Sequence, residues 1–559
     1  MMLEVAGEEI KTLSMDHHGL VAAVCKDLKI AERIDKRLGV DAQRIVSPGQ
    51  AVVAMIINGL GFTNRRLYLT HQFFESKPVA RLLDANITSN DLTDYTLGHT
   101  LDEIWRYGTS QLFAEIAFET AIENNLLNDT NHLDTTSLSV HGEYEIKEEP
   151  NVINITYGHS KAHRPDLKQA VLSLVVNGPG SIPIWMESLN GNSSDKDSFH
   201  ETIKKVNEFQ KQINLEKKFK WVADAALYAK DKLLKNNDYV WLTRVPETIK
   251  EAANLVKKPT KEIDWKEQGD GYKTASFTSN YGDLEQRWIL IFSEQAYVRE
   301  VKTLEKKLTK SDEKLKQILW HLGNELYKCH DDAKHSLEKI NKKHLLYTIK
   351  SEIVPVMKYE KPGKPKPGDE KIIAGYKIES SFERNAEAVE VLQNEKGRFI
   401  LATNDLDKEN YSEECILHEY KEQQDVEGGF RFLKDPWFMV DSIFLKSPKR
   451  IEGLMMVMTL CLMVYNIAQY KFRESLKEKN ETIPNQIGKK VDNPTVRWIF
   501  QIMEGIGIVS FFRNNISEPF KEIITNINEL RIKIIYHFGE TACRMYGLIQ
   551  NNCVEGLGM

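Results

Sequence analysis

The 559-residue sequence predicts an α/β protein in which a mixed sheet with covering helices is interrupted by a strand-containing insertion and flanked by helical regions. Three observations support this prediction. Short β-rich runs begin at about residue 128 and give way to alternating helical and strand patterns up to about 249. Strand-like and strongly charged pieces fill residues 250–405. Apolar residues at helical spacing dominate residues 1–127 and the residues after 480.

The first 127 residues are expected to form a helical domain. Its clearest boundary is the stretch SPGQ, in which Ser47 would cap a helix, Pro48 would take its first position and Gln50 would complete a capping box. This arrangement predicts a helix from Ser47 to Gly59. Apolar periodicity predicts two further helices, over residues 18–38 and 99–126.

Residues 128–249 are predicted to form the first part of the core. Strand-like runs, each closed by glycine or a polar turn, precede a helix, a strand running into a helix, and a last strand. The strand-like runs are 133–142, 151–158, 170–178 and 182–188. The helix covers 197–213, and the last two strands begin near 219 and 239. This succession is compatible with a ribonuclease-H-like core, a mixed sheet with covering helices.

The insertion is predicted over residues 250–405. It contains strand-like pieces, a charged helical stretch from about 298 to 350, and a Pro/Gly/Lys-rich linker at 358–371. The lysine-rich run is typical of a solvated surface, and binding to phosphate groups is the alternative. A strand near 398–405 leads into the second part of the core, residues 406–480, and residues 481–559 are expected to form a helical region that could dimerise.

Composition favours a reducing, cytoplasmic setting. The six cysteines form no C-x-x-C pair, and the N-terminus lacks the apolar core of a signal peptide. The most apolar run, residues 454–467, is shorter than the roughly 20 residues needed to cross a bilayer, so we expect a buried core helix. A formal net charge of -6 does not by itself indicate a nucleic-acid partner.

Two aspartates stand out in the predicted sheet. Asp134 lies within the first strand, where an aspartate is a poor strand former and costly to bury unpaired. Asp224 follows a buried strand, at the carboxyl end where open sheets place their sites. Taken singly, each aspartate could equally be a helix cap or a turn former.

A third group of polar residues lies on one predicted helix. Tyr420, Gln423, Glu427 and Lys434 fall within about 60° of one helical face. The pair Gly428-Gly429 weakens a helix by roughly 1 kcal/mol per glycine, so either the helix bends there or its backbone approaches a neighbour closely. A solvent-facing charged stripe is the alternative explanation.

The spacing on this helix resembles the Tyr-x2-Arg-x3-Glu-x6-Lys signature of one large group of bacterial insertion-sequence DDE transposases. Tyr420, Glu427 and Lys434 match the signature, whereas Gln423 replaces its arginine and puts any charge-based role at that position in doubt. The resemblance extends along most of the chain, through the stretches SPGQAVVAMIINGLGF, YGHSKAHRPDLKQ, GNSSDKDSF, VADAALY, FILATNDLD and FLKDPWF.

The resemblance implies a ribonuclease-H-like fold whose catalytic and metal-binding triad is Asp134, Asp224 and Glu427, with the insertion between the second aspartate and the glutamate. Three carboxylates suit Mg²⁺, a hard cation that prefers oxygen ligands, and Mn²⁺ should be able to substitute. Such a site can cleave DNA at transposon ends with water as nucleophile. With a DNA 3'-hydroxyl as nucleophile, the same site can join those ends to target DNA.

The resemblance also implies DNA contacts. Tyr420, Gln423 and Lys434 would touch phosphates near the scissile bond, and Lys161 and Arg164 are candidate backbone contacts in a turn that could also be purely structural. The expected partners are double-stranded DNA with terminal inverted repeats, target DNA and a second copy of the chain. The N-terminal helical domain is the expected DNA-binding domain, and the setting would be a bacterial cytoplasm with action at the nucleoid.

Two other functions remain open at this stage. A DNA-binding protein derived from a transposase would recognise DNA ends without cleaving them. A ribonuclease-H-like resolvase would share the carboxylates but would need neither the insertion nor the terminal helical regions. An intact triad argues against the first alternative.

Overall fold

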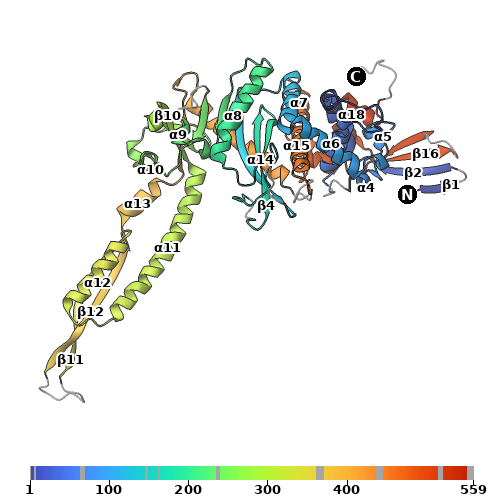
Figure 1. Ribbon diagram of the computed structural model, residues 1–559. Helices are drawn as coiled ribbons and strands as arrows, with labels where there is room; N and C mark the ends of the chain where they lie inside the picture. Colours follow the sequence, from blue (N-terminus) through green and yellow to red (C-terminus); the bar gives the residue numbers. More distant parts are fainter. Residues whose placement is uncertain are drawn as a thin grey trace. The chain divides into compact units, whose positions relative to one another are not determined.

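The computed structural model (Figure 1) forms a mixed α/β structure that divides into two units. Unit 1 comprises residues 1–241 and 418–559, and unit 2 comprises residues 242–417. The residues that the structure describes are 2–5, 8–62, 69–144, 149–161, 164–233, 239–360, 370–435, 438, 445–513 and 520–549. Unit 2 is slightly longer than the insertion expected from the sequence.

The sheet of unit 1 combines antiparallel and parallel pairs. Its strands are β3 (Thr130–Val140), β4 (Lys168–Asn177), β5 (Ile182–Leu189) and β6 (Lys220–Ala223), in the order β5-β4-β3-β6. The β5-β4 and β4-β3 pairs are antiparallel, and β3 and β6 are parallel. Helix α8 (Asp195–Gln212) packs on β3. Leu133 pairs with Ala223, so the residues that follow them lie side by side.

One expected strand is almost absent. Residues 151–158 form only an isolated bridge between Thr156 and Gln169. Their backbone groups bond to a loop instead, because Asn154 donates to the Asn190 side chain at 2.8 Å and accepts from Gly191 at 3.0 Å. Residues 151–158 were expected to form a strand because their apolar residues alternate with polar ones. Here the buried apolar side chains keep this alternation without the segment pairing as a strand.

The helices of the N-terminal region are shorter than expected. Helix α3 (Pro48–Gly59) confirms the predicted boundary, with a complete capping box at Ser47. The helix expected over 18–38 is divided at Lys29, whose φ of 52° is left-handed, and the one expected over 99–126 is divided at Gly108, with φ of 105°. The resulting helices are α1 (His18–Asp27), α2 (Ile30–Leu38), α6 (Asp94–Tyr107) and α7 (Thr109–Glu123).

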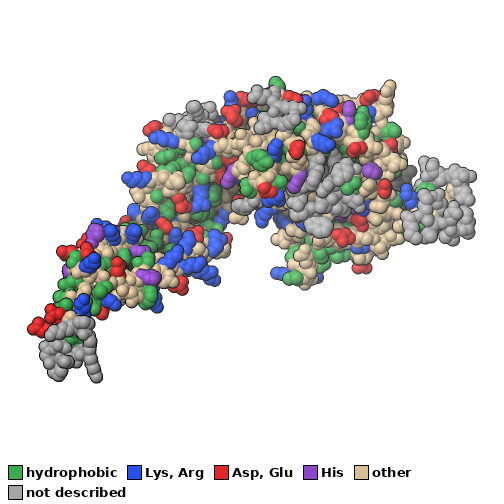
Figure 2. Space-filling model, turned by 60° about the horizontal axis from the view of Figure 1, so that its bottom comes forward, with side chains coloured by type: hydrophobic (Ala, Val, Ile, Leu, Met, Phe, Trp, Pro, Cys, Tyr) green, Lys and Arg blue, Asp and Glu red, His purple; other side chains and the backbone are tan. Residues whose placement is uncertain are grey.

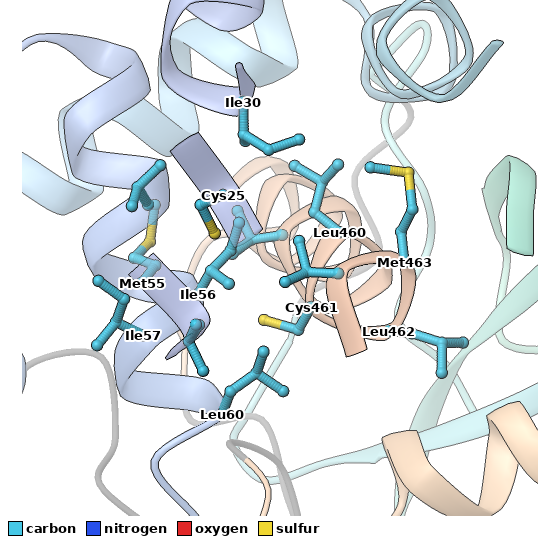
Figure 3. Packing of buried hydrophobic residues seen from close by; sticks show 14 of the residues in the cluster. Cys25, Ile30, Met55, Ile56, Ile57, Leu60, Leu460, Cys461, Leu462 and Met463 are labelled. Atoms are coloured by element: carbon cyan, nitrogen blue, oxygen red, sulfur yellow. The ribbon is translucent and has the colours of Figure 1, made fainter. Parts of the chain in front are cut away.

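Helix α15 (Pro448–Glu478) is the central core helix of unit 1. It is much longer than the expected apolar run, and 89% of its most apolar 18-residue window is buried within the protein, although its length and composition would also suit a membrane span. Apolar side chains of α15 pack against those of α1, α2 and α3, as Figure 3 shows around Cys25, Ile56 and Cys461. Helices α7 and α15 also pack on β5. The expected buried core helix is therefore confirmed.

The chain termini of unit 1 contain a sheet where helices were expected. Strands β1 (Met2–Val5), β2 (Glu8–Ser14), β16 (Gly507–Arg513) and β17 (Lys521–Thr525) pair in the order β1-β2-β16-β17. The prediction of purely helical terminal regions is wrong, because β2 is completed by a strand almost 500 residues away in the sequence. The other elements of unit 1 are α4 (Thr70–Phe74), α5 (Val79–Leu82), η2 (Ser89–Asp91), η3 (Ala225–Leu227), α9 (Lys230–Leu233), β14 (Ile483–Pro484), β15 (Lys490–Val491), α16 (Val496–Ile502), α17 (Glu529–His537) and α18 (Glu540–Met545).

The sheet of unit 2 is antiparallel, in the order β7-β13-β10-β9-β8. Its strands are β7 (Trp241–Arg244), β8 (Lys266–Glu267), β9 (Tyr272–Ser279), β10 (Gln286–Ser293) and β13 (Arg398–Thr403). Smaller elements beside it are α10 (Lys250–Lys257), η5 (Thr260–Glu262), η6 (Tyr281–Asp283) and α13 (Ala386–Asn394). The strand-like pieces that the sequence indicated in this region are confirmed.

A long β-hairpin covered by two helices forms the rest of unit 2 (Figure 1). Its elements are α11 (Glu294–Asn324), α12 (His330–Lys343), β11 (Tyr347–Tyr359) and β12 (Lys371–Arg384). Leu315, Leu319 and Ile378 belong to the apolar cluster beneath the helices. The two ends of the expected linker at 358–371 belong to the strands of this hairpin. Its residues 361–369 lie outside the described residues.

Candidate active site

Asp134 and Asp224 lie next to each other at the parallel β3-β6 pair. The register that pairs Leu133 with Ala223 brings the two following aspartates together. The Asp134 carboxylate accepts a hydrogen bond from the Thr135 backbone N–H at 2.7 Å. The Asp224 carboxylate caps η3 by accepting the Ala226 backbone N–H at 2.8 Å. The capping alternative is thus correct for Asp224, and it does not exclude a role in the site.

The surroundings of both aspartates disfavour the charged form. Burial is the largest cause that raises the pKa of Asp134 to about 6, and the charges of Asp224 and Asp195 act in the same direction. Burial also raises the pKa of Asp224, with a further contribution from Asp195. Carboxylates in a partly buried site repel one another. A cation that binds between them offsets this repulsion and stabilises their charged forms.

Asp195, the first residue of α8, adds a third carboxylate to this site. It accepts a hydrogen bond from the Thr135 hydroxyl at 2.5 Å. The Lys161 ammonium lies 3.0 Å from Asp195 and 3.7 Å from Asp134. It also donates to the Thr135 carbonyl oxygen at 2.8 Å. Lys161, expected from the sequence as a DNA-backbone contact, therefore contacts the carboxylates of this site, and its DNA contact stays a prediction.

Sequence reasoning missed Asp195 because an aspartate in the first turn of a helix is common for a reason unrelated to chemistry: it stabilises the helix dipole. The only signal that could have found it is its place in the stretch GNSSDKDSF, one of those that carry the family resemblance.

Helix α14 (Glu413–Leu433) carries the signature residues and is attached to β3 through Gln423. The Gln423 side-chain amide donates to the Leu133 carbonyl oxygen at 3.0 Å, and its oxygen lies 3.3 Å from Nδ1 of His132. Only 8% of Gln423 is exposed. The residue that replaces the signature arginine thus holds α14 against the strand that contains Asp134, and its predicted DNA contact remains untested.

The glycine pair does not interrupt α14. A Cβ atom on Gly429 would lie 3.1 Å from a methyl group of Leu462, so this glycine allows α15 to approach closely. Of the two explanations offered by the sequence, close approach holds at Gly429. A Cβ atom on Gly428 would meet no atom within 4 Å, and the packing does not explain that residue.

The two ends of the polar face of α14 differ in their surroundings. Lys434, near its C-terminal end, lies close enough to Asp134 and Lys161 for both charges to affect its pKa, which is lowered chiefly by burial. Glu427 lies between Gln423 and Lys434 on this face and is exposed. No three His, Cys, Asp or Glu side chains within the described part of the chain are close enough together to hold a metal ion. The structure therefore brings Asp134 and Asp224 together but does not join Glu427 to them as a ligand set.

The remaining candidate residues are less clearly placed at the site. Tyr420 is partly buried on α14. The Arg164 guanidinium makes two bonds to the Asp166 carboxylate, at 2.8 and 2.6 Å, which favours the structural turn over a free phosphate-binding group. The residues FLKDPWF include positions 436 and 437, which lie outside the described residues.

The acidic side chains are not gathered into a ligand set among the described residues, but their donor atoms are of the type that a hard divalent cation prefers. Asp134, Asp224 and Asp195 offer carboxylate oxygens, the ligand type that Mg²⁺ and Mn²⁺ prefer. The position of the Lys161 ammonium among these oxygens shows that the site attracts positive charge.

Comparisons with known proteins add little to this site. Residues 10–118 match a family model described as a domain of unknown function (DUF4277), a segment that ends before Asp134. No curated protein matches the sequence. Among solved structures, the chain is similar to piggyBac transposase in a cryo-EM structure of its synaptic complex with hairpin DNA, with 10% identity and a TM-score of 0.36 over 87% of this chain and 80% of that one. At this TM-score we draw no conclusion from the similarity.

Proposed function

We propose that this protein is a DNA transposase that cleaves DNA at transposon ends and joins those ends to target DNA. The observation that supports this most directly is that Asp134, within β3, lies beside Asp224, which directly follows the end of the parallel strand β6, and that both carboxylates have raised pKa values. Perturbed carboxylates at the carboxyl end of a strand are typical of catalytic sites. The resemblance of α14 to the transposase signature supplies the reaction class.

We also propose that the sheet of unit 1 is a ribonuclease-H-like core. The order β5-β4-β3-β6, with β3 and β6 as its parallel pair and α8 as a covering helix, supports this assignment. Unit 2 would then be the insertion between Asp224 and Glu427. The helices preceding β3, with the segment that matches the uncharacterised domain, would be the DNA-binding region.

In this proposal, Asp134, Asp224 and Glu427 would hold Mg²⁺ or Mn²⁺, which would supply Lewis acidity toward the attacking and leaving oxygens. The chain's own residues position the DNA. Gln423 keeps α14 against β3, the strand that carries Asp134. Lys434 and Lys161 would bind phosphate oxygens beside the scissile bond, and Tyr420 would donate its hydroxyl to the strand.

A second candidate function is a DNA-binding protein that recognises transposon ends without cleaving them. One observation favours it: Glu427 is exposed and does not join the aspartates in a ligand set. Cleavage assays separate the two functions, because only the transposase requires the carboxylates.

The proposed partners are double-stranded DNA with terminal inverted repeats, target DNA and a second copy of the chain. Excision requires two ends to be held together, which favours a homodimer in the active complex. Residues 481–559, expected from the sequence as a region that could dimerise, add no apolar surface at Ile499, Phe500 and Ile508, because the same chain covers these residues, each at most 3% exposed. The dimer therefore rests on the requirement for two ends.

The test of the proposed function is metal-dependent cleavage of a duplex that carries the repeats flanking the gene. Asp134→Asn, Asp224→Asn and Glu427→Gln should each abolish cleavage and joining while leaving DNA binding largely intact, because each removes a ligand charge with little change in volume. Asp129→Asn is the matched control, since Asp129 precedes β3, is exposed and pairs with Lys217. Near-normal turnover by any of the three variants would remove that residue from the triad, and absence of cleavage by the wild-type protein would favour the second candidate.

A further inference from the structure

Helix α11 presents a row of basic side chains to solvent. Lys302, Lys306 and Lys310 follow each other at four-residue spacing and are exposed, so they lie along one face. Arg299, Lys307 and Lys314 widen the same face. We call these six residues the α11 basic face. In Figure 2, blue side chains gather along the flank of unit 2 where α11 runs.

The opposite face of α11 is apolar. Leu308, Leu315 and Leu319 are buried, and the last two pack in the cluster beneath the helix. Packing therefore fixes the rotation of α11 and turns the basic face away from the hairpin. The orientation of the lysines follows from the core and does not depend on their own contacts.

The acidic residues of α11 mostly have partners elsewhere in unit 2. Glu305 and Asp312 each lie 2.7 Å from the Arg384 guanidinium. Glu300 accepts the Gly397 backbone N–H at 3.0 Å. Of the acidic residues near the basic face, Glu313 is the one that points among the lysines by its spacing.

The six cations of the α11 basic face outnumber the carboxylates beside them. No ion pair among the described residues of the chain includes any of its six members. Like charges four residues apart destabilise a helix by roughly 0.2–0.5 kcal/mol per pair, so a row of such pairs is unfavourable unless an anion binds along it. A surface hollow of about 840 Å³ runs along α11 from Tyr297 to Glu313. Lys302, Lys306 and Lys310 line it together with Glu305, Glu313 and an apolar edge, so it adjoins the basic face.

We propose that the α11 basic face binds the phosphate backbone of duplex DNA. A straight helix advances about 1.5 Å per residue, so the face from Lys302 to Lys314 extends for roughly 18 Å, long enough to meet several successive phosphates of one strand. Lysine side chains at this spacing bind phosphate charge without reading bases. The inference rests on the proposed function for the identity of the polyanion, and it assigns to the insertion a role in holding DNA.

The test uses the full-length protein and a fluorescent duplex of mixed sequence, with affinity measured by anisotropy over a range of NaCl concentrations. The triple variant Lys302→Gln, Lys306→Gln, Lys310→Gln should bind more weakly, and the slope of log affinity against log salt should fall by about 3, since each lost phosphate contact removes roughly 0.9. The matched control is Lys334→Gln, Lys339→Gln, Lys342→Gln on α12, where these exposed lysines share the helix with Asp331, Asp332 and Glu338. The control removes the same charge and should change the slope much less.

An unchanged slope in the α11 variant, or an equal loss in the α12 variant, would overturn the inference. Failure of the inference is distinguishable from failure of the proposed function. If the α11 variant binds DNA as the wild type does, while cleavage by the wild-type protein depends on Asp134, only the DNA-binding role of the α11 basic face is refuted. Circular dichroism and the melting temperature of both triple variants exclude loss of folding as the cause, because all six substituted lysines are exposed.

Discussion

The ammonium of Lys161 lies 3.0 Å from the carboxylate of Asp195, the acidic residue beside the proposed metal ligands Asp134 and Asp224. The ammonium also lies 3.7 Å from Asp134. A cation that binds these oxygens must therefore compete with Lys161 or displace it. Once displaced by a cation, the Lys161 ammonium would be able to bind a phosphate group of a bound DNA strand.

Lys161→Gln should increase the affinity of the DNA-free protein for Mn²⁺. The expected gain is roughly threefold to tenfold, equal to about 1 kcal/mol, because the ion pair is partly exposed and worth little more than that. Isothermal titration calorimetry measures it directly. Lys168→Gln is the control, since Lys168 donates to the Tyr144 carbonyl and contacts none of the carboxylates discussed. Unchanged or weaker Mn²⁺ binding by Lys161→Gln would show that the two cations do not compete.

Gln423→Ala should destabilise unit 1 by about 1–3 kcal/mol, because it removes the amide that bonds to the Leu133 carbonyl and His132 in a buried setting. Denaturant unfolding measures the change. Gln424→Ala is a suitable control, since Gln424 is the exposed neighbour on the same helix. If Gln423 instead served DNA alone, Gln423→Ala would lose DNA affinity at unchanged stability.

Lys434→Ala should weaken DNA binding regardless of sequence and lower the salt slope by roughly 0.9, the value of one phosphate contact. The reason is its position beside Asp134, where a scissile phosphate would lie. Anisotropy titrations at several salt concentrations measure the slope. Lys477→Ala is the control, because Lys477 is exposed at the end of α15 and pairs with Glu474. Equal slopes for Lys434→Ala and the wild type would make Lys434 an ordinary structural lysine.

Local signals in the sequence were enough to place several elements correctly. Ser47 and Gln50 specify the start of α3 through bonds made within one helical turn, so no information from the rest of the fold is needed. Asp134 is recognisable from the sequence because a carboxylate in a buried strand is unusual. Its proximity to Asp224, in contrast, required the parallel register of β3 and β6, which periodicity does not determine.

Features set by distant contacts could not be predicted in the same way. Strand β2 is stabilised by its antiparallel pairing with β16, and nothing in the sequence of residues 8–14 identifies that partner. The break at Lys29 depends on a left-handed backbone at a residue with no special preference for it. Asp195 resembles any acidic residue at a helix start until the fold places it beside Lys161.

Glu452 provides a test of the core of unit 1 through pH. It lies on α15, is 7% exposed, and accepts hydrogen bonds from the Ile153 backbone N–H at 3.2 Å and the Trp105 indole N–H at 3.3 Å. Burial is the main cause that raises its pKa from 4.5 to about 7. These two bonds offset only part of the cost of burying a charge, so the protonated form is favoured in the folded protein.

The folded protein therefore holds a proton on Glu452 in a pH range where the unfolded chain has already released it. Between about pH 4.5 and 7, the free energy of unfolding should fall as pH rises, by up to about 3 kcal/mol in total, and the loss should be complete above the folded pKa. Glu452→Gln removes this dependence, because the amide is neutral at every pH and its oxygen can accept the same two bonds. The variant should thus melt several degrees above the wild type at pH 8, and the difference should shrink toward pH 5.

The measurement is the difference in melting temperature between Glu452→Gln and the wild type at each pH, which cancels the other titrating groups. That subtraction is needed because the buried His17, whose pKa is lowered to about 4 chiefly by burial, makes the folded protein lose stability as pH falls below the unfolded histidine value. Glu478→Gln, at the exposed end of the same helix, is the control and should give a small difference that does not vary with pH. A Glu452→Gln difference that is equally flat would mean that Glu452 is charged in the folded protein, and that water or a nearby cation compensates it.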